Sequence, residues 1–401
     1  MSFKTLRDFD LKGKRVLVRA DLNVPAKDGK VTDTTRIDRL KTTIDFLTAK
    51  GAKTVLLSHF GRPKSATDTQ FSQAFLAPVC EKSWGHSVAF AKDCVGEEAA
   101  KAIAGMKDGD IVLLENVRFH KGEEANDPAF VAELSKLGDI YVNDAFSAAH
   151  RAHASTEGLA HRMPTAAGFL MEAELNALSD ALEAPKKPVI AIVGGSKIST
   201  KLSVLNNLVQ KVDYLFLGGG MANTFFAAQG VEVGKSLCER DMIDEAKKIM
   251  ATAKKAGCDI VLPIDRVCVV KFGENAPFEI RDANAMPAEE EAVDVGPQTI
   301  EKLEDILSGC KTALWNGPMG VFEVKPFDRG TNDLARTVAT LTKSGSLVSV
   351  AGGGDTVSAL ENAGAADDFT YISTAGGAFL EWLEGKELPG VAALTAKKAA
   401  A

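Results

Sequence analysis

Paired cysteines, long apolar runs and an excess of basic residues are all missing from this chain of 401 residues. Its cysteines are scattered, and none forms a CxxC pair or stands among histidines at metal-ligand spacing. The six are Cys80, Cys94, Cys238, Cys258, Cys268 and Cys310. This pattern argues against a cysteine-based metal site or a disulfide framework, and it favours a reducing compartment.

No apolar run approaches the roughly 18 residues that a membrane-spanning helix needs. The opening stretch MSFKTLRDFDLKGKR is too charged for a signal peptide. The formal net charge of −7 argues against a nucleic-acid partner, because such proteins usually present a basic surface. We therefore expect a cytoplasmic protein without membrane or nucleic-acid partners, in which a basic pocket for a small anion is still possible.

Three familiar catalytic signatures are also missing. The stretch VGGSKIS lacks the spacing of a P-loop, and neither it nor AGGGDT has the GxGxxG spacing of a dinucleotide-binding turn. A nicotinamide-dependent dehydrogenase is therefore a weak alternative. We find no Ser-His-Asp-like or reactive-cysteine arrangement, so covalent catalysis is not indicated. A non-catalytic module that binds anions or nucleotides is the other class to weigh.

The length exceeds what one hydrophobic core usually holds, so two domains of about 150–200 residues are expected. Apolar runs alternate with helix-like stretches, which predicts βα units around parallel sheets. The fold class is therefore α/β, and each half of the chain is expected to form its own sheet.

A helix is predicted to join the two halves. In GFLMEAELNALSDALEAPKKP, residues 168–188, the apolar positions Met171, Leu175, Leu178 and Leu182 share one helical face. Pro185 and Pro188 stop the pattern. We place the N-terminal domain at 1–168, the interdomain helix at 169–187, the C-terminal domain at 188–380 and a tail at 381–401.

In the first half, apolar runs are followed by polar and cationic residues. Strand 15–19 leads to Asp21 and Asn23, and the later runs lead to Arg62, Arg118 and Arg151, accompanied by His59, His120, His150 and His153. Ligands of open α/β sheets bind beyond the carboxyl ends of strands, so these groups could converge on one phosphate or carboxylate. The alternative for each residue alone is a surface or structural role.

In the second half, similar runs are followed by glycines. Gly194–Gly195, Gly218–Gly220 and Gly352–Gly354 let backbone N–H groups approach a phosphate chain or a flat base. Lys197 and Lys201 lie four residues apart, and we expect them to open a helix and share its face. Asp355 is a candidate Mg²⁺ ligand, although simple capping of the helix by Asp355 is the plainer alternative.

Long motifs throughout the chain resemble those of phosphoglycerate kinases. They are VRADLNVP, TRI, SHFGRP, ENVRFHKGEE, NDAFSAAHRAHAS, GGSKISTK, LGGGMANTF, DVGPQTI, WNGPMGVFE, AGGGDT and GKELPG. The resemblance covers the chain from end to end and departs from the usual pattern at Ser147, Ala148, Ser196 and Ala375. It implies two Rossmann-like domains with parallel sheets, joined by the interdomain helix, with the tail folding back onto the N-terminal domain.

The implied reaction is reversible transfer of a phosphoryl group from 1,3-bisphosphoglycerate to ADP, giving 3-phosphoglycerate and ATP with Mg²⁺ bound to the nucleotide. By position, the residues implied for phosphoglycerate are Asp21, Asn23, Arg36, His59, Arg62, Arg118 and Arg151. Those implied for the nucleotide are Lys197, Lys201, Gly218, Gly219, Asn316, Glu323, Gly353, Gly354, Asp355 and Thr356. Arg36, Lys197 and the helix start near Gly376 are expected to stabilise the transferred group, with Asp355 as the metal ligand.

The resemblance also implies a monomer that bends at a hinge when both substrates are bound. The acceptor carboxylate is already a nucleophile, so the transfer needs alignment and charge neutralisation and no general base.

Overall fold

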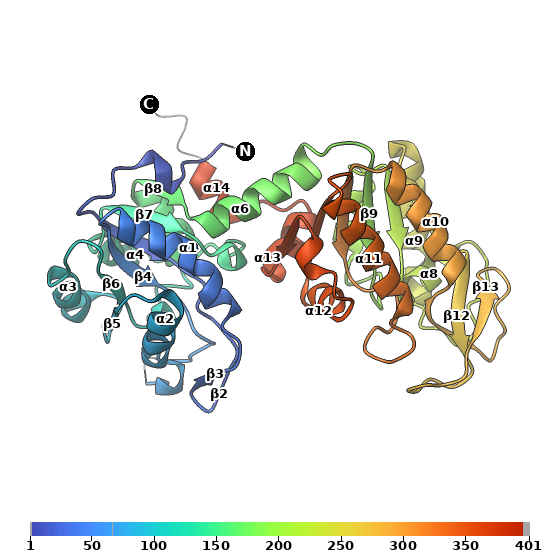
Figure 1. The fold of residues 1–401 in the computed structure, drawn as a ribbon, viewed down its shortest axis with the longest axis horizontal. Helices are drawn as coiled ribbons and strands as arrows, with labels where there is room; N and C mark the ends of the chain where they lie inside the picture. Colours follow the sequence, from blue (N-terminus) through green and yellow to red (C-terminus); the bar gives the residue numbers. More distant parts are fainter. Residues whose placement is uncertain (1, 66, 396–401) are drawn as a thin grey trace. The chain divides into compact units, whose positions relative to one another are not determined.

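The computed structural model describes residues 2–65 and 67–395, which divide into two compact units (Figure 1). The first unit contains residues 2–175 and 387–395, and the second contains residues 176–386. The division falls inside helix α6 (Phe169–Leu178), after Leu175. The part of the expected tail beyond residue 395 lies outside the described residues.

The first unit is built on a parallel sheet of six strands in the order β5-β6-β4-β1-β7-β8. Its central strands are buried along nearly their whole length, as parallel strands covered on both faces must be. The strands are β1 (Arg15–Arg19), β4 (Lys53–Leu57), β5 (Val88–Phe90), β6 (Ile111–Leu113), β7 (Ile140–Asn143) and β8 (Thr165–Ala167). A small hairpin, β2 (Ala26–Lys27) and β3 (Lys30–Val31), stands apart from this sheet.

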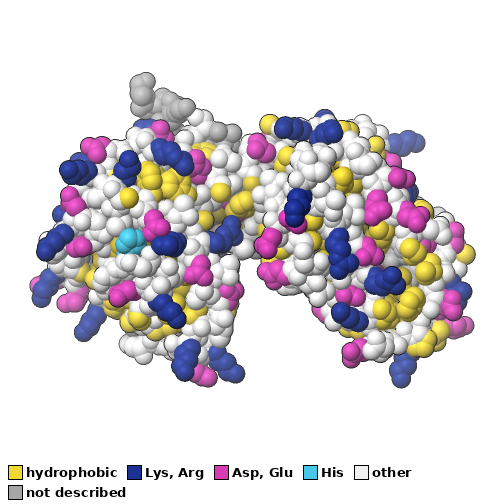
Figure 2. All heavy atoms as spheres, viewed as in Figure 1, with side chains coloured by type: hydrophobic (Ala, Val, Ile, Leu, Met, Phe, Trp, Pro, Cys, Tyr) yellow, Lys and Arg dark blue, Asp and Glu magenta, His cyan; other side chains and the backbone are white. Residues whose placement is uncertain are grey.

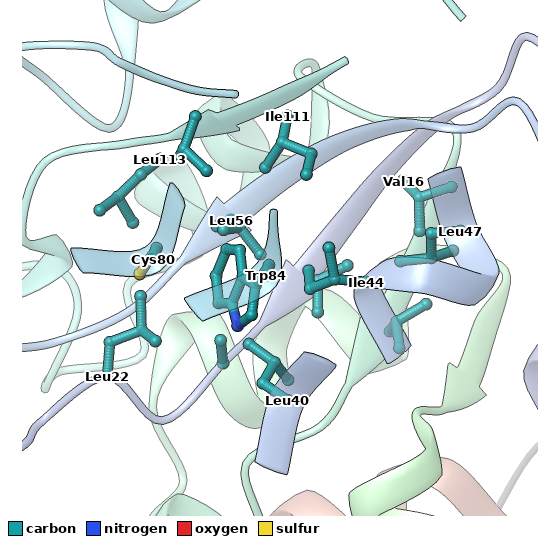
Figure 3. Packing of buried hydrophobic residues seen from close by; sticks show 14 of the residues in the cluster. Val16, Leu22, Leu40, Ile44, Leu47, Leu56, Cys80, Trp84, Ile111 and Leu113 are labelled. Atoms are coloured by element: carbon teal, nitrogen blue, oxygen red, sulfur yellow. The ribbon is translucent and has the colours of Figure 1, made fainter. Parts of the chain in front are cut away.

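Helices cover this sheet and bury its apolar side chains. They are α1 (Thr35–Ala49), α2 (Ala77–Trp84), α3 (Gly96–Ala104), α4 (Pro128–Ser135), α5 (Leu159–Arg162) and α14 (Pro389–Thr395). Trp84 lies within one buried cluster among Leu40 and Ile44 of α1 and Leu56 of β4 (Figure 3). Its indole N–H donates to the Ile37 carbonyl at 2.8 Å, so the ring is buried without an orphan donor. This packing fixes α1, which carries Arg36, against the sheet.

The second unit repeats the plan with a parallel sheet in the order β11-β10-β9-β15-β16-β17. The two parallel sheets confirm the predicted α/β class. The strands are β9 (Val189–Val193), β10 (Tyr214–Leu217), β11 (Asp259–Val261), β15 (Thr312–Asn316), β16 (Val348–Gly352) and β17 (Tyr371–Ser373). The helices are α7 (Leu202–Leu208), α8 (Gly220–Ala228), α9 (Ile243–Ala256), α10 (Pro297–Gly309), α11 (Arg329–Lys343), α12 (Gly354–Asn362) and α13 (Gly377–Leu383).

A second, antiparallel sheet of the same unit was not anticipated from the sequence. It consists of β12 (Asp265–Val269), β13 (Glu279–Asp282) and β14 (Glu291–Val295), with β12 in the middle. Only β12 and β14 contribute a buried face, and β13 is mostly exposed. The strands of this antiparallel sheet therefore lack the continuous apolar run by which a buried parallel strand is recognised in a sequence.

The joining helix is shorter than the predicted 169–187. Helix α6 continues into a π-helical turn, η7 (Ser179–Glu183), and the helical conformation ends at Ala184, before Pro185. All four residues of the predicted apolar face are buried. Asp144, at the end of β7, caps the start of α6, where its Oδ1 accepts from the N–H groups of Leu170 at 2.8 Å and Met171 at 3.0 Å.

Helix α14 belongs to the first unit, where the Gly390 N–H donates to the Ala149 carbonyl at 2.8 Å. On the visible face of each unit, lysine and arginine side chains are interspersed with acidic ones (Figure 2). Within residues 2–65 and 67–395, no helix combines the length and apolarity that crossing a membrane requires.

Candidate active site

The carboxyl ends of β1, β4, β6 and β7 bring most of the predicted phosphoglycerate residues to one edge of the first sheet. Asp21 and Asn23 follow β1, and His59 follows β4. Arg118 lies in the 3-10 turn η4 (Val117–Phe119) after β6, and Arg151 follows β7. The strands are parallel, so these loops emerge on the same side of the sheet.

One group at this edge consists of Asp21, Asn23 and Arg36. The Nη1 atom of Arg36 lies 3.0 Å from Asp21 Oδ2 and donates to the Asn23 carbonyl at 2.8 Å. Asn23 Oδ1 in turn accepts from the Gly61 N–H at 2.9 Å, which ties the β1 loop to the β4 loop. Ser147, one of the departures from the family pattern, donates its hydroxyl to Asp21 Oδ2. Arg36 is thus oriented by two partners before any ligand binds.

A second group gathers positive charge. Burial and the neighbouring Arg19, Arg118 and Arg151 hold the pKa of His59 well below its ordinary value. Burial and Arg151 lower the pKa of Arg118 to about 10, against a raising effect of Glu124. The arginines that lower the pKa values of His59 and Arg118, in addition to burial, mark a local excess of positive potential. Such a site is suited to an anion with more than one charge.

His153 belongs to the same group, since burial and then Arg118 and Arg151 lower its pKa to about 4. Arg62 is not part of this cationic group. It is exposed and follows Gly61 directly, and its side chain makes no hydrogen bond or ion pair within the described part of the chain. Arg118, by contrast, is fixed by donating from Nη1 to the Gly61 carbonyl at 2.8 Å.

Sequence reasoning missed three buried residues behind this cluster: Arg19, Glu123 and Ser155. Arg19 is the last residue of β1 and is 1% exposed. Its Nε donates to Ser155 Oγ at 2.8 Å, and Ser155 Oγ donates to Glu123 Oε1 at 2.6 Å. All three lie in motifs that carry the family resemblance, VRADLNVP, ENVRFHKGEE and NDAFSAAHRAHAS, but no local pattern brings them together.

The second unit holds a cavity of about 550 Å³. Of the predicted nucleotide residues, Gly219, Glu323 and Asp355 line it. Gly219 has φ 68° and starts α8, and a Cβ atom there would come within 2.7 Å of the Gly195 carbonyl oxygen. A side chain at this position would therefore be strained and would clash, which explains the glycine.

Other predicted nucleotide residues form a hydrogen-bonded group of loops beside the cavity. This group, called the frame below, joins Asn316 and Gly317 to Gly352 and Thr356. Asn316 ends β15 and donates from Nδ2 to the Gly352 carbonyl at 2.6 Å. The Thr356 hydroxyl accepts from the Gly317 N–H at 2.7 Å. Gly353 has φ 101° and precedes α12, whose first turn carries Gly354 and the exposed Asp355. Gly218 follows β10, where a Cβ atom would meet Met319 Sδ at 2.8 Å.

Lys201 is bound into this frame. Its Nζ donates to the Asn316 carbonyl at 3.0 Å and also to Asn316 Oδ1. Burial lowers the pKa of Lys201 to about 8, while Asp355 acts in the opposite direction. A buried ammonium group near a carboxylate and a helix start is well placed for phosphate oxygens.

The prediction that Lys197 and Lys201 share a helical face is wrong. Helix α7 begins at Leu202, and Lys197 lies in the preceding loop, exposed to solvent. Ser199 explains the difference, because its N–H and hydroxyl donate to the carboxylate of Glu239 at 3.0 and 2.6 Å. These bonds hold the segment in turns and compete with a helical start. Gly376, the remaining predicted residue, precedes α13 with φ 56°.

Four further residues of the cavity wall were missed: Asn223, Leu237, Arg266 and Asp294. Asp294 is fully buried, and burial raises the pKa of its carboxyl group to about 8. Arg266 is 2% exposed and donates from Nη1 to Asn223 Oδ1 at 3.1 Å. Arg266 and Asp294 lie on the antiparallel sheet, which the sequence analysis did not place, so their position beside the glycine loops was hidden.

One cluster outside these sites joins Asp93, Cys94 and His120, whose ligand-type atoms lie within 4.8 Å of one another. His120 Nε2 is 2.6 Å from Asp93 Oδ1, so the two side chains satisfy each other. Burial raises the pKa of the Cys94 thiol well above its ordinary value. The cluster is therefore accounted for as a structural contact.

A parallel α/β unit with cations gathered at one sheet edge and a second with a glycine-lined cavity are the features of an α/β enzyme that acts on small anionic molecules. The family model described as phosphoglycerate kinase matches residues 6–386. The chain is 60% identical over 398 residues to the phosphoglycerate kinase of Agrobacterium fabrum, covering 99% of this chain and 100% of that one. Identity to the Rhizobium meliloti enzyme is 60% over 392 residues, covering 98% of each chain.

Solved structures agree. The phosphoglycerate kinase of Coxiella burnetii superposes with a TM-score of 0.93 at 41% identity, covering 99% of this chain and 100% of that one. That of Pyrococcus horikoshii gives 0.80 at 32% identity, covering 98% of each. The chain belongs to the phosphoglycerate kinase family. It is a glycolytic enzyme that transfers a phosphoryl group to and from the carboxyl group of 3-phosphoglycerate, with a nucleotide as the other substrate.

Proposed function

We propose that the first unit binds 3-phosphoglycerate and the second binds the Mg²⁺ complex of ADP or ATP. The observation that carries the first assignment is the group at one sheet edge in which burial and the neighbouring arginines lower the pKa values of His59, Arg118 and His153. Arg62, Arg118 and Arg151 hold the C3 phosphate. Asp21 and Asn23 hold the hydroxyl and carboxylate end, next to Arg36.

The nucleotide assignment rests on the lined cavity and its frame. Glycines at 218, 219, 353 and 354 admit the ligand, while Lys201 and the start of α12 face its phosphates. Lys197, in the exposed loop before α7, and Glu323 complete the set with Asn316 and Thr356. The cavity wall also favours Leu237 and Arg266 as contacts for the remainder of the nucleotide.

A magnesium ion fits this donor set. Asp355 is an exposed carboxylate that lines the cavity, and Mg²⁺ on a nucleotide typically uses one or two carboxylates together with phosphate oxygens. When bound, the ion neutralises charge on the nucleotide phosphates. The chain itself supplies Asp355 for the ion and Lys201 for the phosphates.

Catalysis then consists of alignment and electrostatic stabilisation. The carboxylate of 3-phosphoglycerate attacks in line without a general base, and charge develops on the equatorial oxygens of the moving group. Arg36, Lys197 and the N–H groups after Gly376 stabilise that charge. The chain acts as a monomer in the cytoplasm, which its acidic net charge and six free cysteines favour.

A pair of variants tests the division of ligands between the units. We expect Asp355→Ala to weaken binding of Mg-ADP about tenfold or more, the loss of one charged contact, and to leave 3-phosphoglycerate binding unchanged. Arg151→Ala should do the reverse. Calorimetry with each ligand on each variant gives the four affinities. Equal losses for both ligands in either variant would contradict the assignment.

Closure is the second part of the proposal. A carboxylate held by one unit must meet a phosphate held by the other, so the units close around α6 and η7 or around the Gly376 loop once both ligands are bound. Small-angle X-ray scattering should show a smaller radius of gyration with both 3-phosphoglycerate and Mg-nucleotide than with either alone. Superimposable curves under all conditions would exclude closure.

A further inference from the structure

Arg19 is buried at the end of β1 with each of its terminal nitrogens engaged. Its Nε donates to Ser155 Oγ at 2.8 Å, and Nη1 donates to the Ala20 carbonyl. Its Nη2 lies 2.9 Å from Nδ1 of His59. The guanidinium group is therefore held by three partners and has little freedom to turn away from the histidine.

Ser155 and Glu123 fix Arg19 from behind. Both carboxylate oxygens of Glu123 accept from Ser155, Oε1 from the hydroxyl at 2.6 Å and Oε2 from the N–H at 2.9 Å. A hydroxyl group has one proton to give, so Ser155 Oγ must accept from Arg19. Glu123, Ser155 and Arg19 thus form a directed chain that ends at His59.

The direction of the last bond determines the state of the ring. A guanidinium group carries only donors and stays protonated in proteins, so the Nδ1 atom of His59 must supply a lone pair. A histidine with a lone pair on Nδ1 is neutral and carries its proton on Nε2. No other arrangement of protons satisfies the 2.9 Å contact.

The surrounding charges act in the same direction. Arg19 comes from β1, Arg118 from η4, and Arg151 and His153 from the loop before η6 (Ala154–Gly158). Burial is the largest cause that holds the pKa of His59 well below its ordinary value, and all four groups add to it by disfavouring a positive charge on the ring. Each of these elements therefore places a group near His59 that opposes protonation of its ring.

We infer that Arg19 acts as a positioning residue that holds His59 in its neutral Nε2–H form, so that His59 offers the phosphoglycerate a hydrogen bond and no charge. The statement about the ligand rests on the proposed function, and the statement about the ring does not. The positive charge of the site then comes from the arginines alone. A fixed, neutral donor also keeps its orientation across the pH range in which a free histidine would change charge.

The state of the ring is tested on the full chain without ligand. Long-range ¹H–¹⁵N spectra of the ¹⁵N-labelled protein report the protonation of both ring nitrogens, and the His59→Gln spectrum assigns the signals. We expect an unprotonated Nδ1 and a protonated Nε2 whose shifts stay constant from pH 5.5 to 8. Imidazolium shifts in this range, or a proton on Nδ1, would overturn the inference. Arg19→Met should release the tautomer, so that part of the molecules carry the proton on Nδ1, while burial, Arg118 and Arg151 still keep the ring neutral; an unchanged Nε2–H ring in this variant would remove Arg19 from the positioning role.

The role toward the ligand is tested by two amides. Glutamine at position 59 can place an N–H donor near the site of Nε2, whereas asparagine reaches only the site of Nδ1. Calorimetry with 3-phosphoglycerate should show binding within about threefold for His59→Gln, and at least a tenfold loss for His59→Asn, the value of one hydrogen bond to a charged group. Equal losses would refute the donor role, and no loss in either would remove His59 from the proposed binding site. Neither of these two outcomes bears on the protonation state of the ring, which the spectra determine.

Discussion

Replacing Arg36 by alanine should lower turnover by at least about a thousandfold while Mg-ADP binding stays nearly unchanged. Cations that stabilise a transferred phosphoryl group in other enzymes contribute about 10³–10⁵ in rate. Arg36 lies in the first turn of α1 and is only partly exposed, with Nη1 anchored to Asp21 and to the Asn23 carbonyl. Because these contacts orient the guanidinium group before the reaction, little reorganisation is needed when charge develops.

The expected loss is in turnover, and it should be larger than any change in the KM for 3-phosphoglycerate. Arg36→Lys should recover only part of the rate, because an ammonium group cannot reproduce the fork of the guanidinium. Arg162→Ala is the matched control, since Arg162 is exposed in the same unit. Unfolding in urea should show that Arg36→Ala costs about 1–3 kcal/mol, because the change removes hydrogen bonds of a charged group from a partly buried pair. Near-normal turnover of a folded Arg36→Ala would place Arg36 outside the transition state.

The strands of both parallel sheets could be predicted because each is an apolar run buried on both faces. The run at 15–19 appears as β1 with the expected bounds, and the apolar run that precedes Gly194–Gly195 appears as β9. The residues that follow such runs lie at the carboxyl edge of the sheet by geometry alone. This is why Asn23 and His59 could be placed near each other without a structure, although they are far apart in the chain.

Residues whose partners are distant in sequence could not be placed in this way. Arg19 donates to Ser155, which is 136 positions later, and nothing in the local pattern reveals that contact. Lys197 was assigned to a helix because local spacing allowed it, but Glu239 holds that segment from outside. Asp294 and Arg266 reach the cavity through an antiparallel sheet with one weakly apolar face. In each case a tertiary contact determined the position, and local periodicity carried no trace of it.

The same distinction separates Lys201 from Lys197. Both were predicted from one motif, but only Lys201 is bound into the frame, through two bonds to Asn316. Asn316 is itself fixed by its bond to the Gly352 carbonyl. A lysine held between the ends of two strands has lost most of its side-chain freedom, so binding a phosphate costs little further entropy. We therefore expect Lys201 to contribute more to nucleotide affinity than Lys197 does.

Lys201→Met should weaken Mg-ADP binding about a hundredfold, because it removes charge-assisted hydrogen bonds worth roughly 1.5–3 kcal/mol each and keeps the volume of the side chain. The pKa of Lys201 is lowered by burial to about 8, so the free enzyme loses this charge as the pH rises through 8. Only the charged form attracts phosphate. The affinity of the unmodified chain should therefore fall between pH 7 and 9, and that part of the dependence should vanish in Lys201→Met.

Calorimetry at pH 7, 8 and 9 measures both effects, with Lys211→Met as the matched control. Lys211 is an exposed lysine three residues beyond the end of α7 in the same unit. A melting temperature close to that of the unmodified chain would show that the frame at Asn316 survives the change.

If Lys201→Met kept the full pH dependence, another group would have to titrate near pH 8. Asp294 is the residue to examine then, because burial raises its pKa to about 8 and it lines the cavity beside which Lys201 is held. Deprotonation of either group makes the site more negative by one charge, so both lower the affinity for nucleotide as the pH rises. They are therefore distinguished by substitution, and only a double substitution would abolish a dependence shared by both.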